Sequence, residues 1–206
     1  VIIEALGCVL PHIDTWVIVD TGSKDRTMDV IRDFFRDAGV DGELHQRPWR
    51  DFGTNRTEAL RLCEGKADYA WVMDADDLVV GDLELPRLTL DAYALRFGTS
   101  FTYWRTQIFR TTRPFCYRGV VHEYAACEDG AYTSGRIQGD YHVESRRLGA
   151  RNRAEDKYER DCALLHAALE KDPDDSRSVF YLAQSYLDAG KPEQALKWYR
   201  KRASMG

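Results

Sequence analysis

The first third of the chain alternates between short apolar runs and segments with a helical spacing of apolar side chains. Residues 15–20 form a β-rich run, and residues 25–38 repeat apolar positions at the period of a helix. The alternation continues with a short strand over 43–47, a helix over 52–62 and a third strand over 69–73. Strand, helix, strand, helix, strand at these spacings predicts right-handed crossovers and a parallel sheet.

The middle of the chain has a different pattern. Apolar and polar residues alternate over 91–97 and 101–109, and residues 115–124 and 131–143 are further strand candidates. This pattern predicts an antiparallel extension of the sheet, with long loops around an acceptor site.

The last quarter of the chain has only helical patterns, over 154–169, 176–189 and 192–204. The later two helices resemble a tetratricopeptide repeat, although Arg202 stands where that repeat carries a small residue. One repeat cannot bury its own apolar face, so it must pack on the preceding helix, on the first domain or on residues beyond Gly206. The positions that carry the resemblance are Leu182, Ala183, Tyr186, Gly190, Ala195 and Tyr199.

Composition limits the classes of protein to consider. A chain of 206 residues fits one α/β domain, here assigned to residues 1–150, and a small helical segment over 151–206. The net charge of −5 disfavours a nucleic-acid partner. Five cysteines without a Cys-x-x-Cys pair indicate a reducing compartment, and no apolar run reaches the roughly 20 residues of a membrane span. We therefore expect a cytoplasmic protein, at most peripheral to a membrane.

Carboxylates follow two of the predicted strands. The third strand ends in Asp74, Asp76 and Asp77, and the first ends in Asp20. Ligands of parallel α/β sheets bind at the carboxyl ends of the strands, and Mg²⁺ or Mn²⁺ prefers oxygen ligands. The pattern predicts a cation that holds a nucleotide diphosphate, and the alternative is an aspartate-rich turn that caps the next helix.

Three segments together resemble family 2 glycosyltransferases of the GT-A fold: VDTGSKDRT at 19–27, DFGTNRTEAL at 51–60 and MDADD at 73–77. The segment YRGVVHEY at 117–124 resembles a bacterial subgroup that carries tetratricopeptide repeats after the catalytic domain. The family has a nucleotide-contacting strand before the Asp20 strand, where this chain has only residues 1–12. The N-terminal part of the catalytic domain is therefore expected to be incomplete.

The resemblance implies a glycosyltransferase that inverts the anomeric carbon of a nucleotide-sugar donor, usually a UDP-sugar, with Mn²⁺ or Mg²⁺. By position, Asp20 would contact the base and Asp74 would lie near the ribose. Asp76 would bind the metal and the diphosphate, and Asn55 and Arg56 would line the nucleotide. The other residues expected to contact the donor are Thr21, Gly22, Ser23, Ala75 and His122.

Inversion requires a base that takes the proton of the acceptor. Glu123 is the first candidate and Asp140 its rival, although Glu123 could instead lie on a surface strand. His142 could join Asp74 and Asp76 around the metal, because a neutral imidazole is an acceptable ligand for Mn²⁺, or it could be structural.

A basic run follows His142. It is expected either to fold over the diphosphate as a lid or to flank the next helix in solvent. The run consists of Arg146, Arg147, Arg151 and Arg153.

Three functions fit these patterns. The first is a metal-dependent glycosyltransferase with a peptide, glycan or lipid-linked acceptor. The second is a nucleotidyltransferase, although the Gly-rich basic loop expected near its N-terminus is not found. The third is a non-catalytic protein that senses nucleotide and binds a protein partner through the helical repeat.

Overall fold

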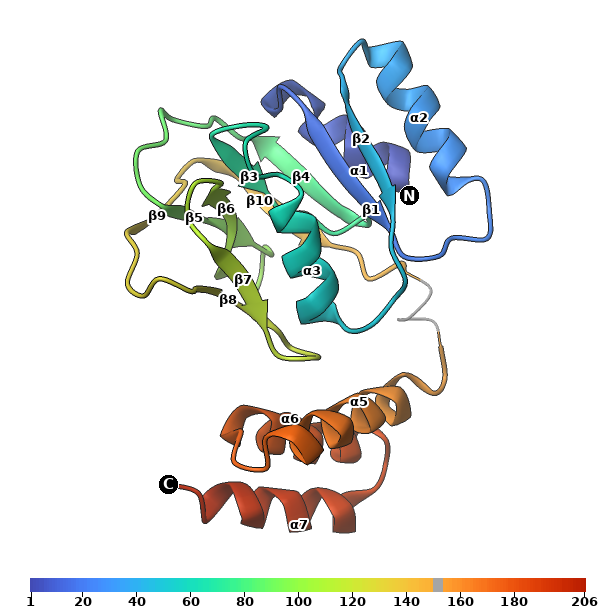
Figure 1. Cartoon of the computed structure of the whole chain (residues 1–206), viewed down its shortest axis with the longest axis vertical. Coiled ribbons are helices and arrows are strands. Elements are labelled where there is room, and N and C mark those ends of the chain that lie inside the picture. Colours follow the sequence, from blue (N-terminus) through green and yellow to red (C-terminus); the bar gives the residue numbers. More distant parts are fainter. Residues whose placement is uncertain (150–153) are drawn as a thin grey trace. The chain divides into compact units, whose positions relative to one another are not determined.

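The computed structural model describes residues 1–149 and 154–206 (Figure 1). Within these residues no helix is long and apolar enough to cross a membrane. The expected domain boundary at 150/151 lies outside the described residues. The chain forms two compact units, and the second takes in two segments from the range expected for the first. Unit 1 comprises residues 1–50, 55–116 and 125–149, and unit 2 comprises residues 51–54, 117–124 and the described residues from 154 onwards.

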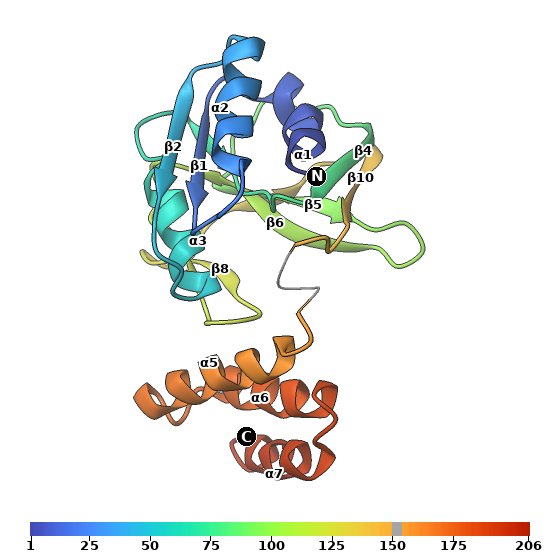
Figure 2. The ribbon, with the colours of Figure 1, turned by 90° about the vertical axis from the view of Figure 1, so that its right-hand side faces the viewer.

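Unit 1 begins with two helices and a parallel pair of strands. β1 (Trp16–Asp20) pairs in parallel with β2 (Gly42–Gln46), and α2 (Thr27–Ala38) connects them, as the sequence predicts. Phe35 of α2 stacks on Trp16 with the ring centroids 4.2 Å apart. Leu6 of α1 (Ile2–Val9) joins this core, and Figure 2 shows both helices beside the strands. The short helix η1 (Leu10–His12) leads from α1 into β1.

The other strands of unit 1 form a mixed sheet in the order β3-β6-β5-β10-β4, with β9 paired to β5. β5 and β6 are antiparallel, as are β4 and β10, whereas β5 runs parallel to β9 and β10. In its core, Leu95, Phe97 and Val143 are at most 1% exposed. The strands are β3 (Tyr69–Trp71), β4 (Asp77–Asp82), β5 (Ala92–Phe97), β6 (Tyr103–Arg110), β9 (Ser134–Arg136) and β10 (Asp140–Ser145).

The sheet differs from the predicted one in two respects. The third strand ends at Trp71 and pairs with antiparallel β6, so the prediction that it extends the parallel pair is wrong. Residues 77–82 form strand β4, where the sequence predicts no element beyond a possible cap at Asp77. The antiparallel extension is confirmed for the pairs β5–β6 and β4–β10. The remaining elements are α3 (Phe52–Arg61) and the two-stranded pair of β7 (Phe115–Arg118) and β8 (Tyr124–Cys127).

Unit 2 contains α5 (Lys157–Lys171), α6 (Ser176–Asp188) and α7 (Pro192–Ala203), close to the predicted helices. α6 packs on both α5 and α7. The helix that precedes the repeat therefore covers part of its apolar face, which is one of the three possibilities given by the sequence. Its centre is apolar, and segment 117–124 adds Val120 and Val121 to it. The buried side chains of this core are Val121, Cys162, Leu165, Leu169, Val179 and Leu182.

Candidate active site

Asp20 shapes the turn at the carboxyl end of β1. It is 7% exposed, and its Oδ1 accepts hydrogen bonds from the backbone N–H groups of Gly22 (2.9 Å) and Ser23 (3.0 Å). Gly22 has a φ of 119°, which favours glycine at this position. Burial raises the pKa of the Asp20 carboxyl, but the hydrogen bonds from Ser23 and Gly22 outweigh it and hold the pKa below its usual value. Asp20 is therefore an anionic group that organises residues 20–23.

Asn55 supports the loop between β2 and α3. Its Oδ1 accepts a hydrogen bond from the N–H of Arg50 (2.9 Å), and its Nδ2 donates one to the carbonyl of Pro48 (3.1 Å). The residue is only 7% exposed. In the structure the amide of Asn55 thus holds this loop, and its expected place along the nucleotide stays a prediction. The same loop reaches Asp20, because the N–H of Arg47 donates to the Asp20 carbonyl (2.9 Å).

Asp74 lies just beyond β3 and is paired with two arginines. Arg56 of α3 donates to its Oδ1, and Arg105 of β6 donates to its Oδ2 at 3.3 Å. Burial raises the pKa of Asp74, but the charges of Arg56 and Arg105 outweigh it and leave the pKa below its usual value. Asp74 is thus anionic, with both of its carboxylate oxygens engaged by guanidinium groups.

We expect Arg56→Ala to lower the free energy of unfolding by about 1–3 kcal/mol at pH 7, because it leaves the charge of Asp74 partly uncompensated. A carboxyl whose pKa is lowered in the fold stabilises it above the unfolded pKa and loses this contribution as pH falls through the folded pKa. The deficit should therefore shrink below about pH 4. Urea unfolding at pH 7 and pH 3 measures it, with Arg32→Ala, which breaks an exposed pair with Asp29, as control. An equal deficit at both pH values would contradict this explanation.

Asp76 is fastened by the segment that follows β10. Its Oδ2 accepts a hydrogen bond from the N–H of Gly149 (2.9 Å), and its carbonyl accepts one from Nε of Arg146 (3.0 Å). Arg146 also donates to Glu4 at 2.8 Å and is 15% exposed. Arg146 is therefore neither a lid nor a solvated helix flank, but a tie between α1 and the Asp76 loop. Arg151 and Arg153 lie outside the described residues.

Asp77 is the first residue of β4 and is completely buried. Neither of its carboxylate oxygens has a hydrogen-bond partner of normal geometry. Burial, followed by the charge of Asp74, raises the pKa of Asp77 to about 6. Since a strand and not a helix follows, Asp77 is not the helix cap that the sequence left as an alternative.

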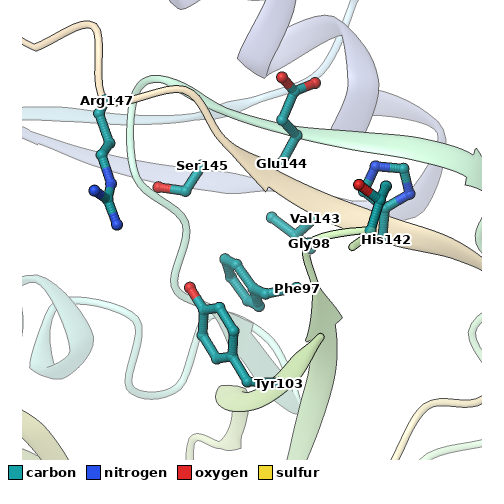
Figure 3. Close-up of a pocket in the computed structure, with 9 residues that line it drawn as sticks. Phe97, Gly98, Tyr103, His142, Val143, Glu144, Ser145 and Arg147 are labelled. Carbon is teal, nitrogen blue, oxygen red and sulfur yellow. The ribbon is translucent and has the colours of Figure 1, made fainter. Parts of the chain in front are cut away.

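A pocket of about 410 Å³ lies at the same end of the sheet. Figure 3 shows Phe97 and Tyr103 at its centre, stacked with ring centroids 5.3 Å apart, while Arg147 and Ser145 lie on one side of the rings. The guanidinium of Arg105, which binds Asp74, lies 5.7 Å from the centroid of the Phe97 ring, and Ser145 pairs with Asp77 in the sheet. The pocket therefore adjoins the carboxylates. Its lining residues are Phe97, Gly98, Thr99, Tyr103, His142, Val143, Glu144, Ser145 and Arg147.

The register of β10 separates His142 and Asp140 from the carboxylates. Ser145 pairs with Asp77, whereas Asp140 pairs with Asp82 at the other end of β4. At about 3.3 Å per residue, Asp140 lies about 17 Å along the strand from the Asp77 end, so the structure does not bring it into this site. His142 lines the pocket three residues before Ser145, about 10 Å along the strand.

The three expected metal ligands do not form a cluster. Within residues 1–149 and 154–206, no group of three His, Cys, Asp or Glu side chains lies close enough together to hold an ion. Asp74, Asp76 and His142 therefore do not form the expected joint ligand set.

Glu123 and His122 belong to unit 2. His122 has a φ of 52°, and its ring stacks on Tyr181 of α6 with centroids 4.1 Å apart. Glu123 is half-buried beside it. The sequence indicates segment 117–124 through its resemblance to a family motif. Its contacts with α6 could not be predicted, because they depend on residues more than fifty positions away.

The family of the chain follows from a comparison with family models. The model described as Glycosyl transferase family 2 matches residues 10–118, a span that holds Asp20, Arg56, Asp74 and Asp76. No match to a curated protein was found. The mixed α/β architecture fits the GT-A fold, and the family implies transfer of a sugar from a nucleotide-sugar donor to an acceptor. This chain belongs to glycosyl transferase family 2 and is a glycosyltransferase.

Proposed function

We propose that the protein transfers a sugar from a UDP-sugar, with inversion and with the help of Mn²⁺ or Mg²⁺, to a peptide, glycan or lipid-linked acceptor. The observation that carries this proposal is the arrangement at the end of β3. Asp74 is held there between Arg56 and Arg105, and Asp76 is fastened next to it. The adjoining pocket offers room for the transferred sugar.

The described side chains fit a metal held mainly by substrate. Mg²⁺ in such sites typically takes one or two protein carboxylates together with phosphate oxygens. Asp76 supplies one carboxylate, and the buried charge of Asp77 makes the surrounding potential more negative. When bound, the ion would neutralise negative charge on the diphosphate leaving group, an effect worth several kcal/mol.

The remaining roles follow from the chemistry of inversion. The acceptor loses a proton as it attacks the anomeric carbon, and we assign Glu123 as the base that accepts this proton. Asp20 and Asp74 are assigned to the nucleoside side of the donor. The helices of unit 2 are assigned to a tetratricopeptide-like segment, supported by the small buried side chains Ala183 and Ala195 on facing helices.

Calorimetric titration with UDP tests the donor and the metal. We expect Mn²⁺ to strengthen UDP binding by the wild type, and Asp76→Ala to remove this dependence on Mn²⁺. The matched control is Asp82→Ala, which removes an exposed carboxylate at the far end of β4. Metal-independent UDP binding by the wild type would reject the metal role. Tighter binding of GDP than of UDP would reject the donor base.

A screen for hydrolysis of UDP-glucose, UDP-galactose and UDP-N-acetylglucosamine, detected as released UDP, then identifies the sugar. The fastest of these donors serves as the substrate in the experiments below.

A further inference from the structure

Segment 117–124, which carries Glu123, is built into the helical unit. The N–H of Phe52 donates to the carbonyl of Val120 (3.1 Å), and Val121 is 3% exposed in the core that Leu165 and Leu182 complete. The segment is thus anchored by a buried side chain just before His122 and Glu123.

One side chain of α6 contacts both neighbours of Glu123. Nη2 of Arg177 donates a hydrogen bond to the carbonyl of His122 (2.7 Å). Its guanidinium also lies 4.8 Å from the centroid of the Tyr124 ring and 4.9 Å from that of Tyr181. The His122 ring stacks on the same Tyr181 with an interplanar angle of 11°. Arg177, Tyr181 and the two residues flanking Glu123 therefore form a single stacked cluster.

The backbone at this point needs such support. His122 has a φ of 52° and Gly119 a φ of 98°, both in the left-handed region. A residue other than glycine in that region costs of the order of 1 kcal/mol or more, and it persists where surrounding contacts fix it. The hydrogen bond from Arg177 is made to the carbonyl of the strained residue itself.

We infer that Arg177 is a positioning residue, which acts through Glu123 by fixing the backbone on both sides of it. This inference rests on the proposed role of Glu123 as the base. Arg177, Tyr181 and segment 117–124, the residues that carry the inference, all belong to unit 2. A guanidinium can stack on two rings and donate a directed hydrogen bond at once, whereas an ammonium lacks the planar face.

Arg177→Ala and Arg177→Lys test the inference in the full chain. Hydrogen exchange of the amides in 119–124 should become faster in Arg177→Ala, with the midpoint of thermal unfolding little changed because Arg177 is exposed. The kcat for hydrolysis of the UDP-sugar should fall about 10- to 100-fold while its KM stays unchanged, since a misplaced base affects chemistry and not donor binding. Arg177→Lys should recover only part of the rate. Arg200→Ala, an exposed arginine on α7, should change neither quantity.

A double variant separates the two proposals. In the Glu123→Gln background, Arg177→Ala should cause no further loss of kcat, because residues that act as a unit are not additive. An equal further loss, or unchanged exchange and kcat in Arg177→Ala alone, would overturn the inference. Failure of the proposed base has its own signature, a normal kcat in Glu123→Gln by itself.

Discussion

Glu123→Gln is expected to lower the rate of sugar transfer by about 10²- to 10⁴-fold and to leave the affinity for UDP nearly unchanged. Glutamine keeps the size of the side chain and its hydrogen-bonding capacity, but it cannot accept the proton that the acceptor loses. In the proposed inverting mechanism no protein nucleophile substitutes for this step, because the sugar is transferred in a single displacement. The loss should therefore appear in kcat with the donor KM unchanged.

The control for this variant is Glu128→Gln, five residues along the chain. Glu128 is exposed, and its closest contact to Arg61 is 3.4 Å, a surface pair that contributes little. Its replacement should leave kcat within about twofold of the wild type, as is usual for surface pairs. If Glu123→Gln turned over as fast as the wild type, Glu123 would not be the base. This result would not by itself support Asp140 as the base, because Asp140 lies at the end of β10 away from Asp77.

Local periodicity predicted most of the elements of this chain. The apolar spacing of α2 and α6 and the strand over 16–20 are local signals, so their bounds agree with the structure to within about two residues. Strand β4 has only Leu78 to Val80 as an apolar run, too short to separate from a turn. The antiparallel pairing of β3 with β6 depends on residues nearly forty positions away, which no local pattern encodes.

In the candidate site, too, some features could be predicted from local sequence patterns and others depend on distant residues. Asp74 and Asp76 were found because their positions follow an apolar strand. Arg105 and Gly149, which bind them, come from β6 and from the segment after β10, and the only local signal for Arg105 is its place in an alternating strand. The position of Asp140 at the end of β10 away from Asp77 could not be predicted, because it depends on the register of the strand.

Side-chain chemistry alone also left ambiguities that only packing resolved. An asparagine amide can bind a nucleotide or nearby backbone groups, and only the structure shows that the Asn55 amide contacts the backbone of Arg50 and Pro48. A fully buried Asp77 with no hydrogen-bond partner of normal geometry could not be anticipated, since aspartate is normally assigned to turns and caps. A buried carboxyl that breaks the ordinary placement rules is expected at functional or strained sites.

Asp77→Asn is expected to stabilise the metal-free protein by about 1–3 kcal/mol at pH 8. The pKa of Asp77 is about 6 in the fold against 3.8 for the ordinary group, so the folded state binds the proton more tightly. This group therefore favours folding at low pH, and its contribution is lost as pH rises from about 4 through 6. The neutral asparagine avoids the cost of burying a charge, which the aspartate incurs only when ionised.

The measurement is urea unfolding in EDTA at pH 4 and pH 8, with Asp82→Asn as the control. Asp82 ends the same strand but is exposed, so its replacement should leave stability unchanged at both pH values. The advantage of Asp77→Asn should be present at pH 8 and nearly absent at pH 4, where Asp77 itself is protonated. Mn²⁺ with UDP should reduce the advantage at pH 8, because a cation near the carboxylates favours the ionised aspartate. An equal gain in the free energy of unfolding at pH 4 and pH 8 would show that asparagine acts through packing. The buried charge of Asp77 would then not explain the stabilisation.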